Sequence, residues 1–190
     1  MVESVLIVSG NEKAANALVL MLKDFGHLSI SMAKSASEAK RAILTNGYDL
    51  VMINAPLSDE YGFELAGLVL NNSLSSCLFI VKSEHFESAS AKLEAIGGLC
   101  ISKPVNRLMF VQSLRWISAT RNRLLGLKKE NIKLQNKIEE MRIVNRAKFS
   151  LMQYLGFDEA QAHRYIEKQA MDKRVTKYQI AMQIIKTYEN

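Results

Sequence analysis

The side chains of this 190-residue chain that are best suited to chemistry are basic, and they are concentrated in its C-terminal part. Residues 111–190 contain 16 Lys and Arg against 8 Asp and Glu, a net charge of +8, whereas residues 1–110 have a net charge of −2. Arg164 and Lys168 lie one turn apart in sequence, so a helix would present both on one face. Such a one-sided charge is typical of a surface that binds a polyanion, although a merely solvated helical surface would show the same composition.

The sequence offers few groups for catalysis. Its three histidines show no spacing typical of a metal site or a catalytic triad, and there is no glycine-rich phosphate loop. Cys77 and Cys100 each lie in an apolar run, so we expect two buried thiols in a reducing compartment rather than a disulfide or a metal pair. We therefore expect neither an enzyme nor a bound metal or other cofactor.

Five short apolar runs alternate with helix-length segments in the first hundred residues. The runs are 4–8, 28–33, 49–54, 77–81 and 98–101, and the segments between them are 11–25, 36–46, 60–72 and 85–96. Ser35 and Ser37 are candidate N-caps for the second segment. The first, third and fourth runs are nearly continuous in Val, Ile, Leu, Met and Phe, which is typical of strands buried on both faces. The alternation predicts a doubly wound α/β fold with a parallel five-stranded sheet.

Residues 106–155 are expected to form almost one continuous helix, because the only glycine in this range is Gly126 and neither proline lies in it. A heptad repeat places several residues at positions a and d, namely Ile117, Leu124, Leu127, Asn131, Leu134, Ile138 and Met141. The repeat predicts a coiled coil. An Asn at an a position, the role that Asn131 fits, favours a two-stranded pair in register. The alternative is a helix that packs on its own domain.

The last forty residues are expected to form a small helical unit. Asp158 with Gln161, and Thr176 with Gln179, have the capping-box pattern that opens helices over about 158–172 and 176–188. Gly156 can close the long helix before them. A helical unit this short is only marginally stable by itself. We therefore expect the long helix to form its first helix and, through the coiled coil, to bring a partner chain beside it.

Residues 4 to about 118 resemble the receiver domain of bacterial response regulators, which has a flavodoxin-like fold. Asn54 ends the third apolar run and Gly62 follows eight residues later, as a glycine follows the phosphoacceptor in receivers. The fifth run ends in Ser102-Lys103-Pro104, which is similar to the lysine and proline of that family.

The resemblance implies a phosphoacceptor position at Asn54 and magnesium positions at Ser9 and Gly10, where the family has acids. An amide is not a nucleophile and cannot form an acyl phosphate, and a magnesium site needs carboxylate oxygens. Lys103 has lost its usual charge partners, so we expect a structural lysine in a strand–helix turn. A domain that keeps a fold without its chemistry is usually retained for binding, so we expect a regulatory protein or a small ligand to dock on it.

Residues 125–188 resemble the ANTAR domain, the RNA-binding module of transcription antitermination regulators. The matching stretches are Arg146-Ala147-Lys148, Leu151-Met152 before Gly156, Glu159 with Ala162 and Ile166, Ala170-Met171-Asp172 with Arg174, and Ile180-Ala181. The order of receiver, coiled coil and ANTAR domain is also the order of that family. A receiver without phosphorylation residues looks most like the amidase-type antiterminators.

These resemblances imply a cytoplasmic homodimer, with no membrane segment, that binds leader-RNA hairpins. The basic residues expected to bind RNA are Arg146, Lys148, Arg164, Lys168, Lys173, Arg174 and Lys177, with Tyr165, Tyr178 and His163 as candidates for stacking on bases. The implied domains are a receiver-like domain over 1–118, a dimerising helix over 119–145 and an ANTAR domain over 125–190. The alternatives are a DNA-binding response regulator and a protein-interaction scaffold.

Overall fold

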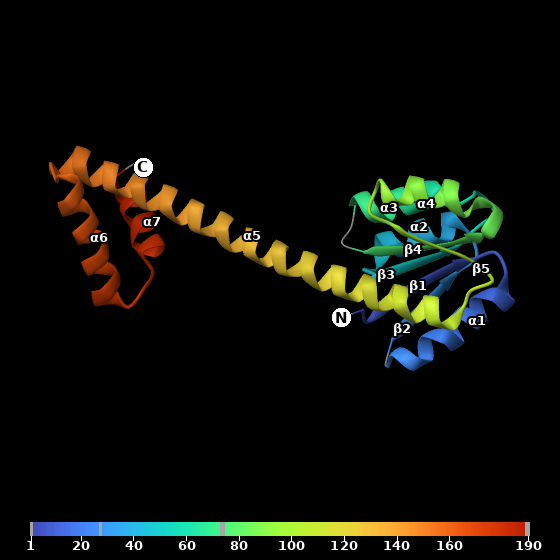
Figure 1. Ribbon diagram of the computed structural model, residues 1–190. Coiled ribbons are helices and arrows are strands. Elements are labelled where there is room, and N and C mark those ends of the chain that lie inside the picture. The colour runs from blue at the N-terminus through green and yellow to red at the C-terminus, as the bar shows by residue number, and fades with distance from the viewer. Residues whose placement is uncertain (1, 27, 73–74, 189–190) are drawn as a thin grey trace. The chain divides into compact units, whose positions relative to one another are not determined.

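The computed structural model describes residues 2–26, 28–72 and 75–188 of the chain (Figure 1). The chain divides into two compact units, Met1–Leu124 and Leu125–Asn190. The last two residues of the predicted ANTAR domain, 189–190, lie outside the described residues. Among the residues that are described, no helix is both long enough and apolar enough to cross a membrane.

The first unit is built on a parallel five-stranded sheet in the order β2-β1-β3-β4-β5. Its strands are β1 (Ser4–Ser9), β2 (Ser29–Ala33), β3 (Leu50–Asn54), β4 (Ser76–Lys82) and β5 (Leu99–Lys103). All five residues of β3 are buried, as the continuous apolar run predicted for a strand covered on both faces. The doubly wound fold predicted from the alternation of runs is confirmed.

Helices cover both faces of this sheet (Figure 1). Helices α2 (Ala36–Thr45), α3 (Phe63–Asn72) and α4 (Phe86–Glu94) contribute to the core on one face. Helix α1 (Glu12–Leu22) and the first turns of α5 (Arg107–Leu155) contribute to the core on the other face. Two short 3₁₀ turns, η1 (Lys23–Phe25) and η2 (Ser83–His85), follow α1 and β4.

The start of one helix differs from the sequence-based expectation, and the start of another decides between two expected caps. The segment predicted to be helical from residue 60 becomes helical only at Phe63, because Gly62 has φ +109°, which no right-handed helix includes. A Cβ on Gly62 would also lie 2.9 Å from Cγ2 of Ile53, so this position requires glycine on two grounds. Of the two candidate caps of α2, Ser35 is the N-cap and accepts a hydrogen bond from the Glu38 amide at 3.1 Å.

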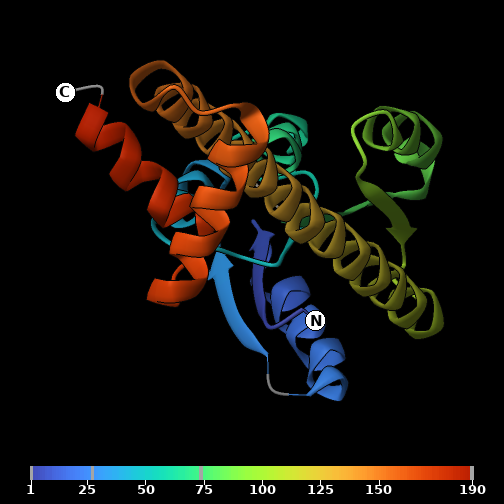
Figure 2. The same ribbon diagram turned by 90° about the vertical axis from the view of Figure 1, so that its left-hand side faces the viewer.

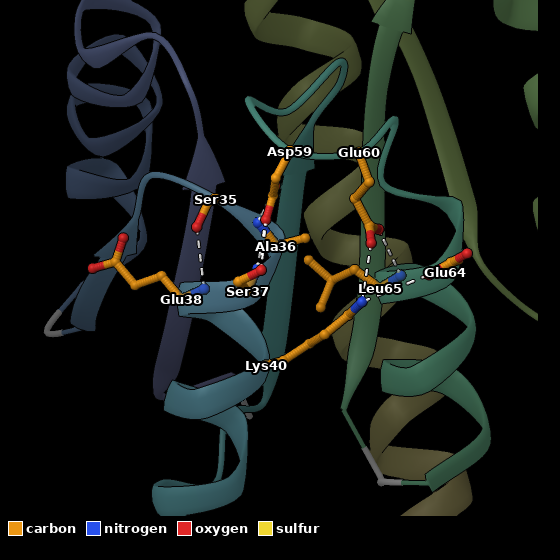
Figure 3. A network of polar contacts seen from close by, with 9 residues as sticks. All are labelled: Ser35, Ala36, Ser37, Glu38, Lys40, Asp59, Glu60, Glu64 and Leu65. Atoms are coloured by element: carbon orange, nitrogen blue, oxygen red, sulfur yellow. Dashed lines mark hydrogen bonds and ion pairs between the residues drawn. The ribbon is translucent and has the colours of Figure 1, made fainter.

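The loop after β3 is tied to the two helices beside it (Figure 3). The Asp59 carboxylate accepts hydrogen bonds from the amides of Ala36 and Ser37 at the start of α2, at 2.8 and 2.9 Å. These backbone bonds, that of Ser37 first, lower the pKa of Asp59 to about 2. Glu60 accepts from the Leu65 amide of α3 at 3.1 Å and pairs with Lys40 of α2 at 3.0 Å. The loop that borders the carboxyl end of β3 is therefore held in place from two sides.

Helix α5 is part of the first unit well beyond its first turn. Ile117, which the heptad pattern placed at the first a position, is buried in the core under the sheet. Arg121 pairs with Asp49, whose other oxygen accepts from the amides of Glu3 and Ser4 at 2.7 and 3.0 Å. Ile117 is therefore not available to a coiled-coil partner, and the exposed part of the heptad pattern begins at Leu124.

The second unit consists of the later turns of α5 with α6 (Glu159–Lys173) and α7 (Lys177–Tyr188) (Figure 2). Its core contains small and branched residues, namely Ala147, Leu151, Ala162, Ile166, Ala170, Ile180, Ala181 and Ile184. Both predicted capping boxes are present: Asp158 with Gln161 at 2.7 and 2.9 Å, and Thr176 with Gln179 at 3.0 and 3.2 Å. Gly156 has φ +67° directly after α5, the left-handed conformation expected of a helix-ending glycine.

Candidate nucleic-acid interface and strand-edge pocket

Four of the seven basic residues predicted to bind RNA lie on or directly after α6. Arg164 and Lys168 are exposed one turn apart on this helix. Lys173 ends the helix, and Arg174 follows in the left-handed conformation, with φ 54°, where its amide closes the last turn. Among the described residues, none of these four side chains forms an ion pair, so their charge is available to a polyanion.

Two other predicted residues already have acidic partners in the chain. Lys148 of α5 pairs with Glu159 of α6, Nζ to Oε1 at 2.9 Å, and only 13% of its side chain is exposed. Lys177 of α7 pairs with Glu167 of α6, whose Oε1 also lies 3.3 Å from Nε2 of His163. Hydrogen bonding to Lys148 and to Lys177 lowers the pKa of Glu159 and of Glu167, respectively. These two lysines therefore connect the three helices, a role that the charge pattern did not reveal.

The seventh residue, Arg146, is exposed on α5, and its carbonyl accepts from the Ser150 hydroxyl at 3.1 Å. Near it, the exposed ring of Phe149 lines a hollow of about 260 Å³ with Asn145, Met152 and the Lys148–Glu159 pair. Phe149 is 72% exposed and was not among the predicted stacking residues. The available signal was its place within one turn of Arg146 on the same predicted helix.

The aromatic side chains predicted to stack on bases are partly exposed. Tyr165 packs edge-on against Phe157, with ring centroids 5.8 Å apart, and keeps 38% of its surface exposed. Tyr178 is 39% exposed and lines a groove of about 300 Å³ with residues of α5. Each of these tyrosines therefore keeps part of its surface available for a further contact.

An apolar stripe on α5 is exposed in the single chain. It consists of Leu124, Leu127, Leu134, Ile138 and Met141, with exposed fractions between 53% and 66%. Asn131 interrupts it and is also exposed. None of these residues belongs to the cores of the two units. The stripe is larger than the scattered single apolar residues that are usual on protein surfaces.

The polar residues predicted at the strand ends meet at the carboxyl edge of the sheet. Asn54 donates through Nδ2 to Oγ of Ser9 at 2.9 Å, and Ser9 donates to the carbonyl of Asn11 at 2.9 Å. Lys103 donates through Nζ to the carbonyl of Ala55 at 2.6 Å. A pocket of about 480 Å³ opens here, lined by Gly10, Asn11, Ala14, Asn54, Ala55, Pro56, Leu57, Ser58 and Lys103.

This lining does not fit a magnesium ion. It offers amide, hydroxyl and carbonyl oxygens but no carboxylate, and the Ser9 hydroxyl is already bonded within the chain. Across the described residues, no group of three or more His, Cys, Asp or Glu is placed to hold a metal. Burial, followed by the charge of Lys82, lowers the pKa of Lys103, because no acid in the pocket favours its charged form.

Comparisons with known proteins match both parts of the chain. Residues 133–185 match the family model of the ANTAR domain. The chain is 21% identical over 183 residues to the transcriptional regulatory protein PdtaR of Mycobacterium tuberculosis, covering 96% of this chain and 89% of PdtaR. It is 27% identical over 117 residues to the transcriptional regulatory protein LytR of Staphylococcus aureus, covering 61% of this chain and 47% of LytR.

Among solved structures, a two-component response regulator from Clostridium difficile is similar, with a TM-score of 0.56 and 24% identity. That match covers 62% of this chain and 96% of the other. The likeness shows the fold, and the first unit accordingly has the flavodoxin-like fold of response-regulator receivers.

Proposed function

We propose that this chain, an ANTAR response regulator, is a transcription antitermination regulator that acts on leader RNA. In it, a receiver-fold domain precedes an ANTAR domain. The observation that carries the proposal is the ANTAR match over 133–185, which includes α6 and the four basic residues on or directly after it. Antitermination requires a protein that stabilises one RNA hairpin arrangement, by contacts to phosphates and to unpaired loop bases. The matches are to regulators and receivers, which supports a regulatory role without catalysis.

RNA would bind on the face of α6 that presents Arg164 and Lys168, together with Lys173 and Arg174 at its end. These side chains have no acidic partner among the described residues, so phosphates can pair with them at little cost within the protein. Arg146, with the exposed ring of Phe149 one turn away, would extend the contact along α5. Lys148 and Lys177 act mainly by holding α5, α6 and α7 together under this surface.

The protein would act as a homodimer through the exposed stripe of α5. Leu124, Leu127, Leu134, Ile138 and Met141 would form the seam, and Asn131 would fix its register. Two ANTAR domains on one dimer engage two RNA elements, so the gain in affinity comes from effective concentration.

The receiver-fold domain would take its input without phosphorylation. The amide of Asn54 cannot form an acyl phosphate, and its pocket has no carboxylate to hold magnesium. A regulatory protein or a small ligand docking on this domain would replace the phosphoryl group as the signal.

The test is a salt titration of binding by the full chain to a two-hairpin leader RNA and to duplex DNA of the same sequence. Four phosphate contacts predict that the logarithm of the RNA-binding constant falls with the logarithm of salt concentration with a slope of roughly −3, about −0.7 for each contact. The double variant Arg164→Gln, Lys168→Gln should reduce this slope by about 1.4. Lys13→Gln, on exposed α1 of the other unit, is the control and should leave the slope unchanged. Equal or stronger binding to duplex DNA would instead support a DNA-binding response regulator.

A further inference from the structure

Two adjoining hollows lie at the carboxyl edge of the sheet and share Ala14, Asn54 and Lys103. The first is the polar pocket of about 480 Å³ described above. The second, of about 330 Å³, is bordered by α1 and by the turn after β5, and its further lining is Ala17, Leu18, Met21, Ile80, Pro104 and Val105. Because three residues line both, the hollows adjoin, and they offer a polar part and an apolar part side by side.

The position of this site in the sheet is the usual one for a ligand. In the order β2-β1-β3-β4-β5, the connections leaving β1 and β3 diverge, so a crevice opens where Ser9 and Asn54 end neighbouring strands. Ligands of open α/β sheets bind at this point. The loop after β3 that forms one wall is fixed by the contacts of Asp59 and Glu60 to α2 and α3 (Figure 3).

The polar part of the site presents a cation without a counter-ion. The Lys103 ammonium has three donors, and one is used on the carbonyl of Ala55. Neither hollow is lined by a carboxylate, and Lys103 forms no ion pair with any described residue. Lys103 is partly buried, where an ammonium is costly unless it is paired, so an anion entering the pocket is favoured.

The amide of Asn54 is fixed at the junction of the two hollows. Ser9 accepts from Nδ2 of Asn54 and from the Asn11 amide at 2.9 and 3.2 Å, and its own proton goes to the Asn11 carbonyl. Because this hydroxyl is saturated, it holds the Asn54 amide in one orientation. The site is thus preorganised for a group beside Lys103.

We propose that the two hollows form one binding site for a small organic monoanion with an apolar tail, with the acid group on Lys103 and the tail between α1 and Pro104-Val105. The anion neutralises Lys103 without the metal or the covalent bond that a phosphoryl group would need. The tail covers Leu18, Met21 and Ile80, which line the apolar hollow. This inference deepens the proposed regulation of the receiver-fold domain, and it can be tested without RNA.

The test uses calorimetric titration of the full chain with acetate, butanoate, hexanoate and octanoate, with 1-hexanol and inorganic phosphate as comparisons. Affinity should rise about two- to fourfold for each added methylene, since a buried methylene contributes ~0.8 kcal/mol. Hexanol should bind at least tenfold more weakly than hexanoate, because it cannot pair with Lys103. Phosphate should bind no better than acetate, because it leaves the apolar hollow empty.

Two variants and one control assign the site. Lys103→Gln should weaken octanoate at least tenfold, and Ala17→Asp, which places a carboxylate in the apolar hollow, should do the same from the other end. Lys13→Gln removes an equal charge from α1 outside both hollows and should bind octanoate as the parent does. Circular dichroism confirms that each variant is folded.

The proposal is overturned if affinity does not depend on chain length, or if Lys103→Gln and Ala17→Asp both bind octanoate normally. Measuring RNA binding of the same samples separates it from the proposed function. A parent chain that binds octanoate but not RNA would refute the RNA role alone. A parent chain that binds RNA but not octanoate would refute only the ligand site.

Discussion

Replacing Leu134 and Ile138 with glutamine should separate the proposed dimer without unfolding either unit. Both side chains are more than half exposed in the single chain, 56% for Leu134 and 66% for Ile138, and neither contributes to a core. Exposed helical substitutions of this kind usually change the free energy of unfolding by less than about 0.5 kcal/mol. Any effect on association therefore comes from the surface that the partner would cover.

The expected loss of association free energy follows from the exposure of these two side chains. Burying a whole Leu or Ile side chain contributes about 1.5–3 kcal/mol, so covering roughly 60% of each contributes about 1–2 kcal/mol. A dimer contains four such side chains, and their loss weakens association by about 4–7 kcal/mol, which raises the dimer dissociation constant by roughly three to five orders of magnitude. Loss of the second ANTAR domain should lower RNA affinity by about 100-fold or more.

Sedimentation velocity of the full chain over a concentration series measures the association, and a filter-binding titration measures the RNA affinity. The matched control is Leu44→Gln, a similar change at a residue of α2 that is 85% exposed outside the stripe. It should leave both quantities unchanged. The reasoning is refuted if the double variant remains a dimer, or if it becomes a monomer that binds RNA as tightly as the parent.

Three further predictions concern the first unit. Gly62→Ala should lower the free energy of unfolding by about 2–4 kcal/mol in urea titrations, because it combines a positive φ with a Cβ contact of 2.9 Å to Ile53. The matched control Gly67→Ala, inside α3 with open space around it, should raise the free energy of unfolding by about 0.5–1 kcal/mol. Burial raises the pKa of Cys77 to about 12, so its thiol should not react with a disulfide reagent at neutral pH until the unit unfolds, and early labelling would contradict the buried site. The pKa of Asp59 is depressed to about 2, so the stability that this carboxylate adds is present above its ordinary pKa and is lost as the pH falls toward 2; Asp59→Asn should remove that part of the acid transition, which circular dichroism against pH would detect.

The sequence by itself determined the elements of this protein and their order. The five strands and the capping boxes at Asp158 and Thr176 follow from neighbours within a few residues, where side-chain periodicity and cap chemistry act directly. One helix start was misplaced: α3 begins at Phe63 and not at residue 60, because the conformation of Gly62 depends on its packing against Ile53 and Phe79.

Residue roles that depend on packing were decided only by the tertiary structure. Ile117 fits a heptad seam by spacing. It is nevertheless buried under the sheet, because α5 packs on the first unit from its start as far as Arg121. Lys148 belongs to a basic cluster by composition, yet it pairs with a glutamate eleven residues away on another helix. The sequence placed Lys103 at a strand end, but only the fold surrounds it with two hollows and no acid. Local patterns fix secondary structure because they act between neighbours, whereas the partner of a charge is set by which helices and strands pack together.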